Sequence, residues 1–259
     1  MNPQRWRPAL SYLAAIATLL FLWQVAAYIY PPYLMPEISV AVDRMKEMLK
    51  TAEFQAGIRQ SFLRLGVGYP LACAVGALLG LLAGLSRSFA RYLRGLISIL
   101  QSVPPITWVP FLVILFGFGN IPIITVITIA SFFPMALSVL NGTEGVNRTH
   151  LELARVMGAS RWQLLAKVYG PETMPSVITG AQVAFGNAWR SLIAAEMVGG
   201  AGNGLGWSIR YAGDTADMAG VLAGIVLVGV SAALIDHLAL EQFKRWVLRW
   251  RSVEGGEAA

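Results

Sequence analysis

The sequence is short of charge and almost free of cysteine. Only 13% of its 259 residues are charged, whereas about 25% is usual in soluble domains. The single cysteine, Cys73, falls in an apolar run, which excludes an internal disulfide and a cysteine-based metal site. Neither GxxxxGKS nor GxxxxGKT occurs, so the chain has no P-loop with which to bind ATP. No nucleophile, base and orienting group are grouped along the chain, so we expect no enzyme, cofactor or metal.

Long apolar runs take the place of charge. Hydrophobic residues make up 56% of the chain, and a bilayer core about 30 Å thick needs roughly 20 apolar residues per helical span. Six such runs occur, at about residues 9–30, 62–85, 93–116, 121–140, 176–199 and 218–239. We therefore predict an all-α integral membrane protein in which six transmembrane helices form one domain over residues 1–259.

The positive charges indicate which side of the membrane each loop faces. Lys and Arg in short loops favour the cytoplasm, and most of them fall on one side, at both termini and in residues 87–94 and 147–172. Four more lie within residues 44–59, in a long outer segment that also carries acidic residues. We expect a multi-pass inner-membrane protein with both termini in the cytoplasm. The sequence pI of about 9.7 then reflects topology rather than nucleic-acid binding.

Glycine, proline and polar residues interrupt or modify the apolar runs. Gly76, Gly80 and Gly84 are four residues apart, so another helix can pack closely on their face, within this chain or in a dimer. The prolines of residues 104–110 predict a kink in the third span. Residues 37–64 form a polar amphipathic stretch that we expect to lie along the outer membrane surface.

The polar segment 147–172 carries the clearest helix start and stop signals in the sequence. Thr149–Glu152 matches a capping box, which predicts a helix from about His150. Gly158 stands where that helix needs a left-handed residue to stop, and Ser160–Gln163 offers a second capping box. Gly170–Pro171 is expected to close the second helix. The pattern predicts a helix, a glycine turn and a helix.

Both short helices carry an apolar side but are too short and too polar to cross a bilayer. These side chains must therefore contact the body of the protein, the membrane surface or another protein. They are Leu153, Val156 and Met157 in the first helix and Trp162, Leu165 and Val168 in the second.

The segment ELARVMGASRWQLLAKVYGP resembles the cytoplasmic EAA loop of binding-protein-dependent ABC importer permeases. In that pattern Glu-Ala-Ala is followed by three residues, Gly, nine residues and Ile-x-Leu-Pro. Leu153 and Gly170 depart from the pattern. The positions in register are Glu152, Ala154, Gly158, Val168 and Pro171. The segments SVPPITWVPFLVILFGFGNIP, AWRSLIAAEMVGGAGNGLGWSI and RWVLRW resemble the nitrate, sulfonate and taurine branch of the same family.

The resemblance implies a type I ABC importer permease fold and a set of partners. One six-span chain would form half of the solute pathway, in a dimer that is usually homotypic in this branch. Two separate ATPase subunits would receive the loop, and a soluble or lipid-anchored binding protein would deliver the solute. The coupling residues implied are Glu152, Ala154, Gly158, Ala159, Ser160, Trp162, Leu165 and Pro171.

Polar residues in the fifth span are candidates for the pathway, because such groups are expensive in a membrane. They are Gln182, Asn187, Arg190 and Glu196. Each could instead serve a structural role, through interhelical hydrogen bonds or, for Glu196, as a partner near the outer gate. Arg190 and Glu196 lie about 120° apart around a helix, which argues against an ion pair between them.

The resemblance alone leaves the solute class open, and the guanidinium of Arg190 favours a small oxyanion, such as a sulfonate, taurine or nitrate. A neutral vitamin or pyrimidine precursor is an alternative within the same importer class. A secondary transporter that works without ATP is a second alternative. Such a protein has no need of a capped docking loop, and it needs a more complete ion relay than Arg190 and Glu196 provide.

Overall fold

The computed structural model describes residues 7–236, and in that range it consists of helices joined by turns and loops, with no β-strand. The helices are α1 (Arg7–Ile29), α2 (Ile38–Lys50), α3 (Ala52–Gly84), α4 (Arg87–Gln101), η2 (Pro105–Trp108), α5 (Val109–Phe116), α6 (Asn120–Glu144), α7 (Arg148–Val156), α8 (Arg161–Leu164), η3 (Leu165–Tyr169), α9 (Gly170–Val198), α10 (Leu205–Asp214) and α11 (Met218–Ile235). The end of the predicted sixth span and the RWVLRW segment lie outside the described residues.

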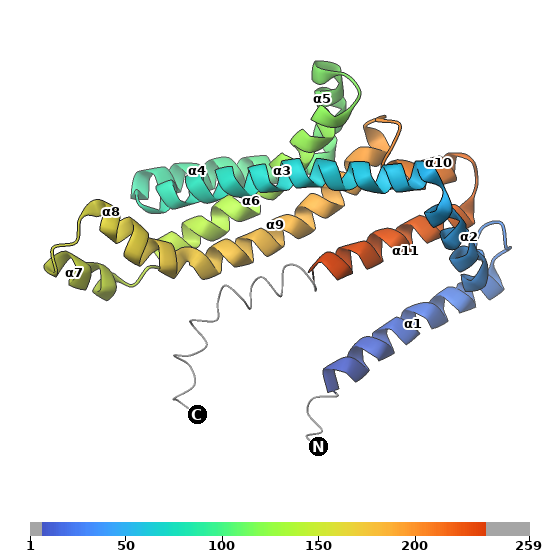
Figure 1. Ribbon diagram of the computed structural model, residues 1–259, viewed down its shortest axis with the longest axis horizontal. Coiled ribbons are helices and arrows are strands. Elements are labelled where there is room, and N and C mark those ends of the chain that lie inside the picture. The colour runs from blue at the N-terminus through green and yellow to red at the C-terminus, as the bar shows by residue number, and fades with distance from the viewer. Residues whose placement is uncertain (1–6, 237–259) are drawn as a thin grey trace.

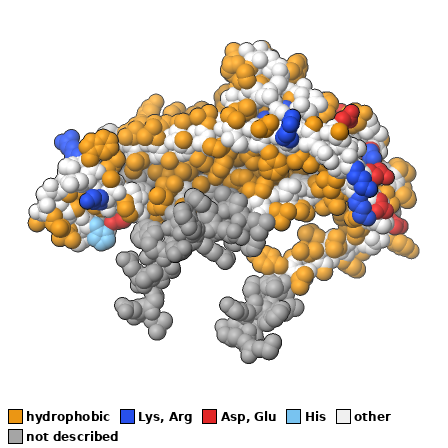
Figure 2. Space-filling view, viewed as in Figure 1, with side chains coloured by type: hydrophobic (Ala, Val, Ile, Leu, Met, Phe, Trp, Pro, Cys, Tyr) orange, Lys and Arg blue, Asp and Glu red, His pale blue; other side chains and the backbone are white. Residues whose placement is uncertain are grey.

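Helix α6 forms the centre of the bundle and packs along both α3 and α9 (Figure 1). Its buried side chains include Val126, Ile127, Val139 and Leu140. The loop helices α7 and α8 lie at one end of the bundle, and α2 and α10 lie at the other. Hydrophobic side chains cover the middle of the face shown in Figure 2, and many of its charged side chains gather over the α2 end.

The glycine face of α3 packs against α6. Of the two predicted uses of this face, packing within the chain and packing in a dimer, the structure shows the first. A Cβ added at Gly80 would lie 2.5 Å from the backbone oxygen of Ala136, and one added at Gly84 would overlap the Thr143 side chain. The two backbones can approach this closely because no side chain stands between them. This face of α3 is therefore used inside the chain.

The predicted count of six spans needs correction. Within the described residues, four helices are long and apolar enough to cross a bilayer, namely α1, α3, α6 and α11, and a bent pair of segments would make a fifth. The predicted fifth span, residues 176–199, lies in α9, which is 29 residues long. Helix α9 is not among those four, and it carries the polar residues Gln182, Asn187, Arg190 and Glu196.

The predicted third span, residues 93–116, is not one continuous helix. Helix α4 ends at Gln101, and the segment Pro105–Phe116 continues at an angle of 79° to it, so that α5 projects from the bundle (Figure 1). Pro104 and Pro105 cause the break, because proline lacks an N–H group and disfavours helical geometry in the residue before it. The predicted kink is confirmed, but it is sharp enough to divide the span.

The polar stretch 37–64 is also divided. Helix α2 covers its first half, packs on α11 and buries Ala41. Residues 52–64 belong instead to α3, the long helix that forms the second span. The expectation of a single surface segment is therefore wrong beyond Lys50, because Thr51 has extended backbone geometry and separates the two helices.

We expect Gly80→Ala to destabilise the protein by about 1–3 kcal/mol, the usual cost of forcing an extra carbon into a packed interior. The measurement is thermal unfolding of the purified chain in detergent. Gly66→Ala is the matched control on the same helix, because its added Cβ would meet no atom within 4 Å. Equal melting temperatures for the two variants would contradict the close approach of α3 and α6.

Candidate functional site

Helix α7 opens the polar loop with a cap that differs from the predicted one. The side chain of Asn147 accepts a hydrogen bond from the backbone N–H of Thr149 at 2.9 Å. The helix therefore begins at Arg148 rather than near His150, and the predicted Thr149–Glu152 capping box is wrong. Asn147 is a favourable N-cap residue and satisfies a free amide of the first turn.

Gly158 stops α7 in the left-handed conformation that the sequence predicts, with φ of +79°. Its N–H donates to the carbonyl of Arg155 at 2.9 Å, and the N–H of Ala159 donates to the carbonyl of Ala154 at 3.0 Å. These two bonds form a Schellman motif, which satisfies carbonyls at the helix end. A Cβ added at Gly158 would meet no atom within 4 Å. Glycine is thus favoured here by backbone conformation and not by lack of space.

Helix α8 begins at the predicted capping box but does not end where predicted. The Gln163 N–H donates to Ser160 Oγ at 3.3 Å, and the Ser160 N–H donates to Gln163 Oε1 at 2.7 Å. The chain then runs through the π-helical turn η3 directly into α9, so the expected stop at Gly170–Pro171 is wrong. In this turn the Gly170 N–H reaches back to Leu165. The wider turn accommodates Pro171, which has no N–H to offer.

The loop presents an apolar surface to its surroundings. Leu153, Val156, Met157 and Trp162 are 59%, 86%, 79% and 78% exposed, and we refer to them as the loop patch. Clustered apolar side chains with this exposure indicate a contact surface. The other predicted coupling residues divide into exposed Glu152, Gly158, Ser160 and Pro171 and half-buried Ala154, Ala159 and Leu165.

Glu172, in the first turn of α9, holds the start of the loop in place. One carboxylate oxygen lies 2.6 Å from His150 Nδ1, and the other accepts from the Asn147 N–H at 2.9 Å. The beginning of α7 is therefore tied to the beginning of α9. The sequence reasoning missed this contact, since nothing in residue spacing shows that positions 22 and 25 residues apart would meet.

The predicted pathway residues of α9 do not share one environment: some lie on a face that is open to the surroundings, and one lies in the protein interior. Arg190 is exposed, and its Nη2 donates to Asn187 Oδ1 at 3.0 Å. Asn187 and Gln182 are half-buried. Glu196 lies apart from them and is fully buried. The prediction that Arg190 and Glu196 do not pair within the helix is confirmed, because each has another partner.

Glu196 forms a buried ion pair with Arg64 of α3. Arg64 Nη1 donates to Glu196 Oε1 at 2.7 Å, and the two side chains are 1% and 0% exposed. The Ser61 hydroxyl donates to the carboxylate at 2.8 Å, and the Gly206 N–H donates to its other oxygen at 2.9 Å. A buried charge survives only when it is paired and hydrogen-bonded in this way.

The other donors of Arg64 extend the network to two further elements. Its Nε donates to Asn120 Oδ1 at 2.9 Å, at the start of α6. Its Nη1 and Nη2 donate to the backbone and side-chain oxygens of Asn203 at 2.9 Å and 2.6 Å. Gly204, with φ of +126°, passes so close to Glu196 that a Cβ would overlap the carboxylate. The loop between α9 and α10 is thus fastened to α3, α6 and α9.

Sequence reasoning missed Arg64, although the residue lies inside the predicted second span and such positions call for a partner. The partner is more than 130 residues away in the chain, and only the fold brings the two together. Among residues 7–236, no group of three or more His, Cys, Asp or Glu side chains is placed to hold a metal ion.

Comparison with known proteins decides the family. Residues 76–245 match the family described as binding-protein-dependent transport system inner membrane component. The chain belongs to this permease family. A putative ABC transporter permease of Methanocaldococcus jannaschii is 33% identical to it over 230 residues, which cover 87% of this chain and 85% of the relative. The putative aliphatic sulfonates transport permease of Bacillus subtilis is 30% identical over 242 residues, covering 92% and 87%.

Other relatives of the permease are named for taurine, nitrate and bicarbonate transport. An inward-facing methionine ABC transporter shares its fold, with a TM-score of 0.62 and 22% identity over 74% of this chain and 94% of that one. The recognition of an ABC importer permease of the nitrate, sulfonate and taurine type is therefore confirmed, as is the type I permease fold. Membership implies an inner-membrane protein that works with ATPase and solute-binding partners.

We expect Glu196→Gln to destabilise the permease by about 3–5 kcal/mol, because it leaves the Arg64 charge buried without its counter-charge. Thermal unfolding in detergent measures the effect. The double variant Arg64→Leu with Glu196→Gln should regain part of the loss, since no unpaired charge remains. Glu47→Gln is the control, because it breaks an exposed ion pair to Arg44 and should leave melting unchanged. If Glu196→Gln melted at the same temperature as the wild type, the ion pair would not stabilise the fold.

Proposed function

We propose that this permease forms half of the pathway of an importer for a small oxyanion, in a homodimer driven by two separate ATPase subunits. The exposed loop patch is the observation that carries the coupling role. Both termini and the α7–α8 loop would face the cytoplasm, and α10 would lie at the outer side. A soluble or lipid-anchored binding protein would deliver the solute there.

The loop has the form of a docking element. Gly158 and two capped helix starts fix the direction of the loop patch, while the contacts of Glu172 connect it to α9. A groove on the ATPase would cover the four apolar side chains, and the exposed Glu152 would pair with a basic residue at its edge. Closure of the two ATPases would then move α9, because loop and helix are joined by a continuous backbone and by Glu172.

The open face of α9 is the proposed pathway lining. A polar face on a helix in the membrane is costly unless protein or water covers it. A second copy of the chain, placed with its α9 opposite, would enclose Gln182, Asn187 and Arg190 of both chains between them. Glu196, which we predicted as a further pathway residue, would act from within the chain by holding the outer loop to α3.

The proposed solute class rests on Arg190 and on the relatives. A guanidinium offers two parallel donors that match an oxyanion, and Asn187 beside it can donate through its amide nitrogen. Relatives of the permease are named for sulfonates, taurine, nitrate and bicarbonate. A neutral vitamin or pyrimidine precursor would gain nothing from this charge, which makes it the weaker candidate.

The docking role predicts that Gly158→Val impairs attachment of the ATPase. A β-branched residue at φ of +79° costs about 1–2 kcal/mol in backbone strain, so the loop patch loses its fixed direction. The measurement is co-purification of the ATPase with the permease. Gly158→Asn is the matched control, because asparagine tolerates this backbone conformation and the site has open space. Normal ATPase recovery and uptake with the valine variant would refute the docking role.

The pathway role predicts that Arg190→Gln loses most solute uptake while assembly and ATP hydrolysis remain. We expect a loss of about tenfold or more, the usual value of a charge-assisted contact. Uptake into proteoliposomes that contain the full transporter is the measurement. Arg190→Lys should retain part of the activity, since it keeps the charge but not the forked donor pair. Full uptake by Arg190→Gln, or a physiological solute that is neutral, would eliminate the oxyanion assignment.

A further inference from the structure

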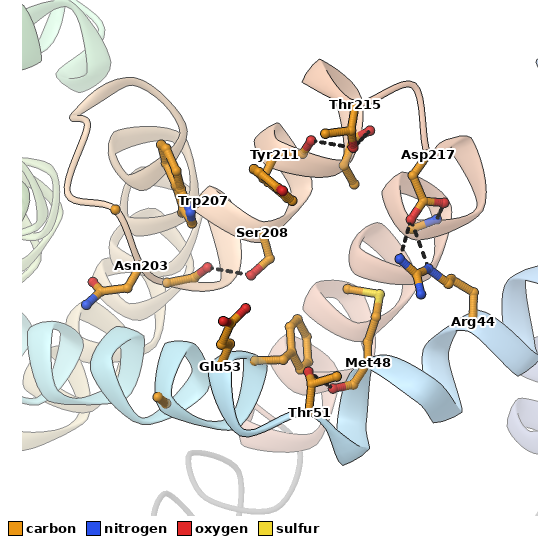
Figure 3. Close-up of a pocket in the computed structure, with 16 residues that line it drawn as sticks. Arg44, Met48, Thr51, Glu53, Asn203, Trp207, Ser208, Tyr211, Thr215 and Asp217 are labelled. Carbon is orange, nitrogen blue, oxygen red and sulfur yellow. Dashed lines mark hydrogen bonds and ion pairs between the residues drawn. The ribbon is translucent and has the colours of Figure 1, made fainter.

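A cavity of about 660 Å³ lies at the α10 end of the permease, away from the loop patch. Its walls come from α2, the start of α3, the loop before α10, α10 itself and the start of α11 (Figure 3). None of the predicted pathway residues Gln182, Asn187 and Arg190 lines it. Its volume falls in the range of about 300–1,000 Å³ that is usual for specific ligand pockets.

The charges in the wall of the cavity do not balance. Arg44 Nη2 lies 2.7 Å from Asp217 Oδ2, and Arg44 Nη1 lies 3.1 Å from Glu47. Hydrogen bonds to Asp217 and to Glu47 raise the pKa of Arg44, and these two carboxylates already match its charge. Glu53, an exposed residue in the first turn of α3, also lines the cavity, and no hydrogen bond or ion pair within the described residues involves its carboxylate. The cavity therefore offers one unmatched negative charge.

Aromatic side chains line the same cavity as this carboxylate. Glu53 extends from α3 toward Ser208 of α10, and Trp207 and Tyr211 lie on the α10 wall of the cavity (Figure 3). The buried Phe54 and the half-buried Met48 contribute to the apolar part of the wall. Arg210 already lies 5.9 Å from the centre of the Trp207 ring, so a cation is accommodated beside this aromatic group. A cavity whose wall holds both a carboxylate and aromatic rings favours organic cations.

The oxyanion that we propose as solute does not suit this cavity, because an unmatched carboxylate repels it. The occupant is therefore expected to come from another component at the outer side. We propose that the cavity receives a lysine or arginine side chain of the solute-binding protein, with the cationic group against Glu53 and its methylene groups against Phe54 and Tyr211. This inference rests on the proposed function only for the identity of the partner.

The first experiment tests the cation site without the partner. The probe is Nα-acetyl-lysinamide, titrated into the full-length permease in lipid nanodiscs and followed by saturation-transfer NMR. We expect saturable binding in which the lysine methylene groups give the signal, and no binding of the neutral Nα-acetyl-norleucinamide. Glu53→Gln should weaken binding about tenfold, the usual loss when a charge-assisted contact is removed.

Glu37→Gln is the matched control for this titration. Glu37 lies at the start of a helix, α2, and is exposed, as Glu53 is at the start of α3, but Glu37 does not line the cavity. Binding should be unchanged in this variant, and its melting temperature should equal that of Glu53→Gln. Equal binding of the lysine and norleucine probes, or equal affinity of Glu53→Gln and wild type, would overturn the cation site.

The second experiment tests the source of the cation. In the complete transporter, Glu53→Gln should raise the concentration of binding protein needed for half-maximal ATPase stimulation about tenfold, while ATP hydrolysis without binding protein stays the same. Nα-acetyl-lysinamide should compete with the binding protein. Cation binding with no effect on the binding protein would overturn the assignment of the partner. If no binding protein stimulated ATP hydrolysis by the wild-type transporter, that result would count against the proposed function. The titration with Nα-acetyl-lysinamide would still decide whether the cation site exists.

Discussion

The ion pair between Arg64 and Glu196 is the contact on which the arrangement of the α10 end depends. It joins α3 to α9, and through Asn120 and Asn203 it also holds the start of α6 and the loop before α10. A pair of buried charges adds little net stability over apolar side chains, but it is expensive to break. It therefore specifies one arrangement of these four segments, in a membrane protein where apolar contacts alone would permit sliding.

The close packing of α3 on α6 has a complementary role over the length of the bundle. Glycines at four-residue intervals bring the two backbones together, and dispersion contacts replace the hydrophobic effect, which is weak between helices in lipid. With α3, α6 and α9 held as one unit, a force applied to the loop helices acts on the whole unit. Glu172 shortens this connection, because it joins the start of α7 to the start of α9.

The amino-acid sequence by itself determined the fold class, the family and much of the loop. Apolar runs separated by basic loops required a helical membrane protein, and local backbone chemistry placed the left-handed Gly158 and the Ser160 capping box correctly. Those features depend on residues within a few positions of each other. Local signals also compete with one another, however. Asn147, not Thr149, is the N-cap of α7, and a π-helical turn continues the helix beyond Pro171, where a stop was predicted.

Only the tertiary structure decided which polar groups face each other. Arg190 and Glu196 look equivalent in the sequence, as two charges in one predicted span, yet one is exposed and the other is buried against Arg64. The cavity beside Glu53 likewise joins segments that are more than 100 residues apart. Spacing along a helix fixes the direction of a side chain on that helix alone. What the side chain meets is set by the helices that pack against it, and for α3, α9 and α10 those contacts are made across the length of the chain.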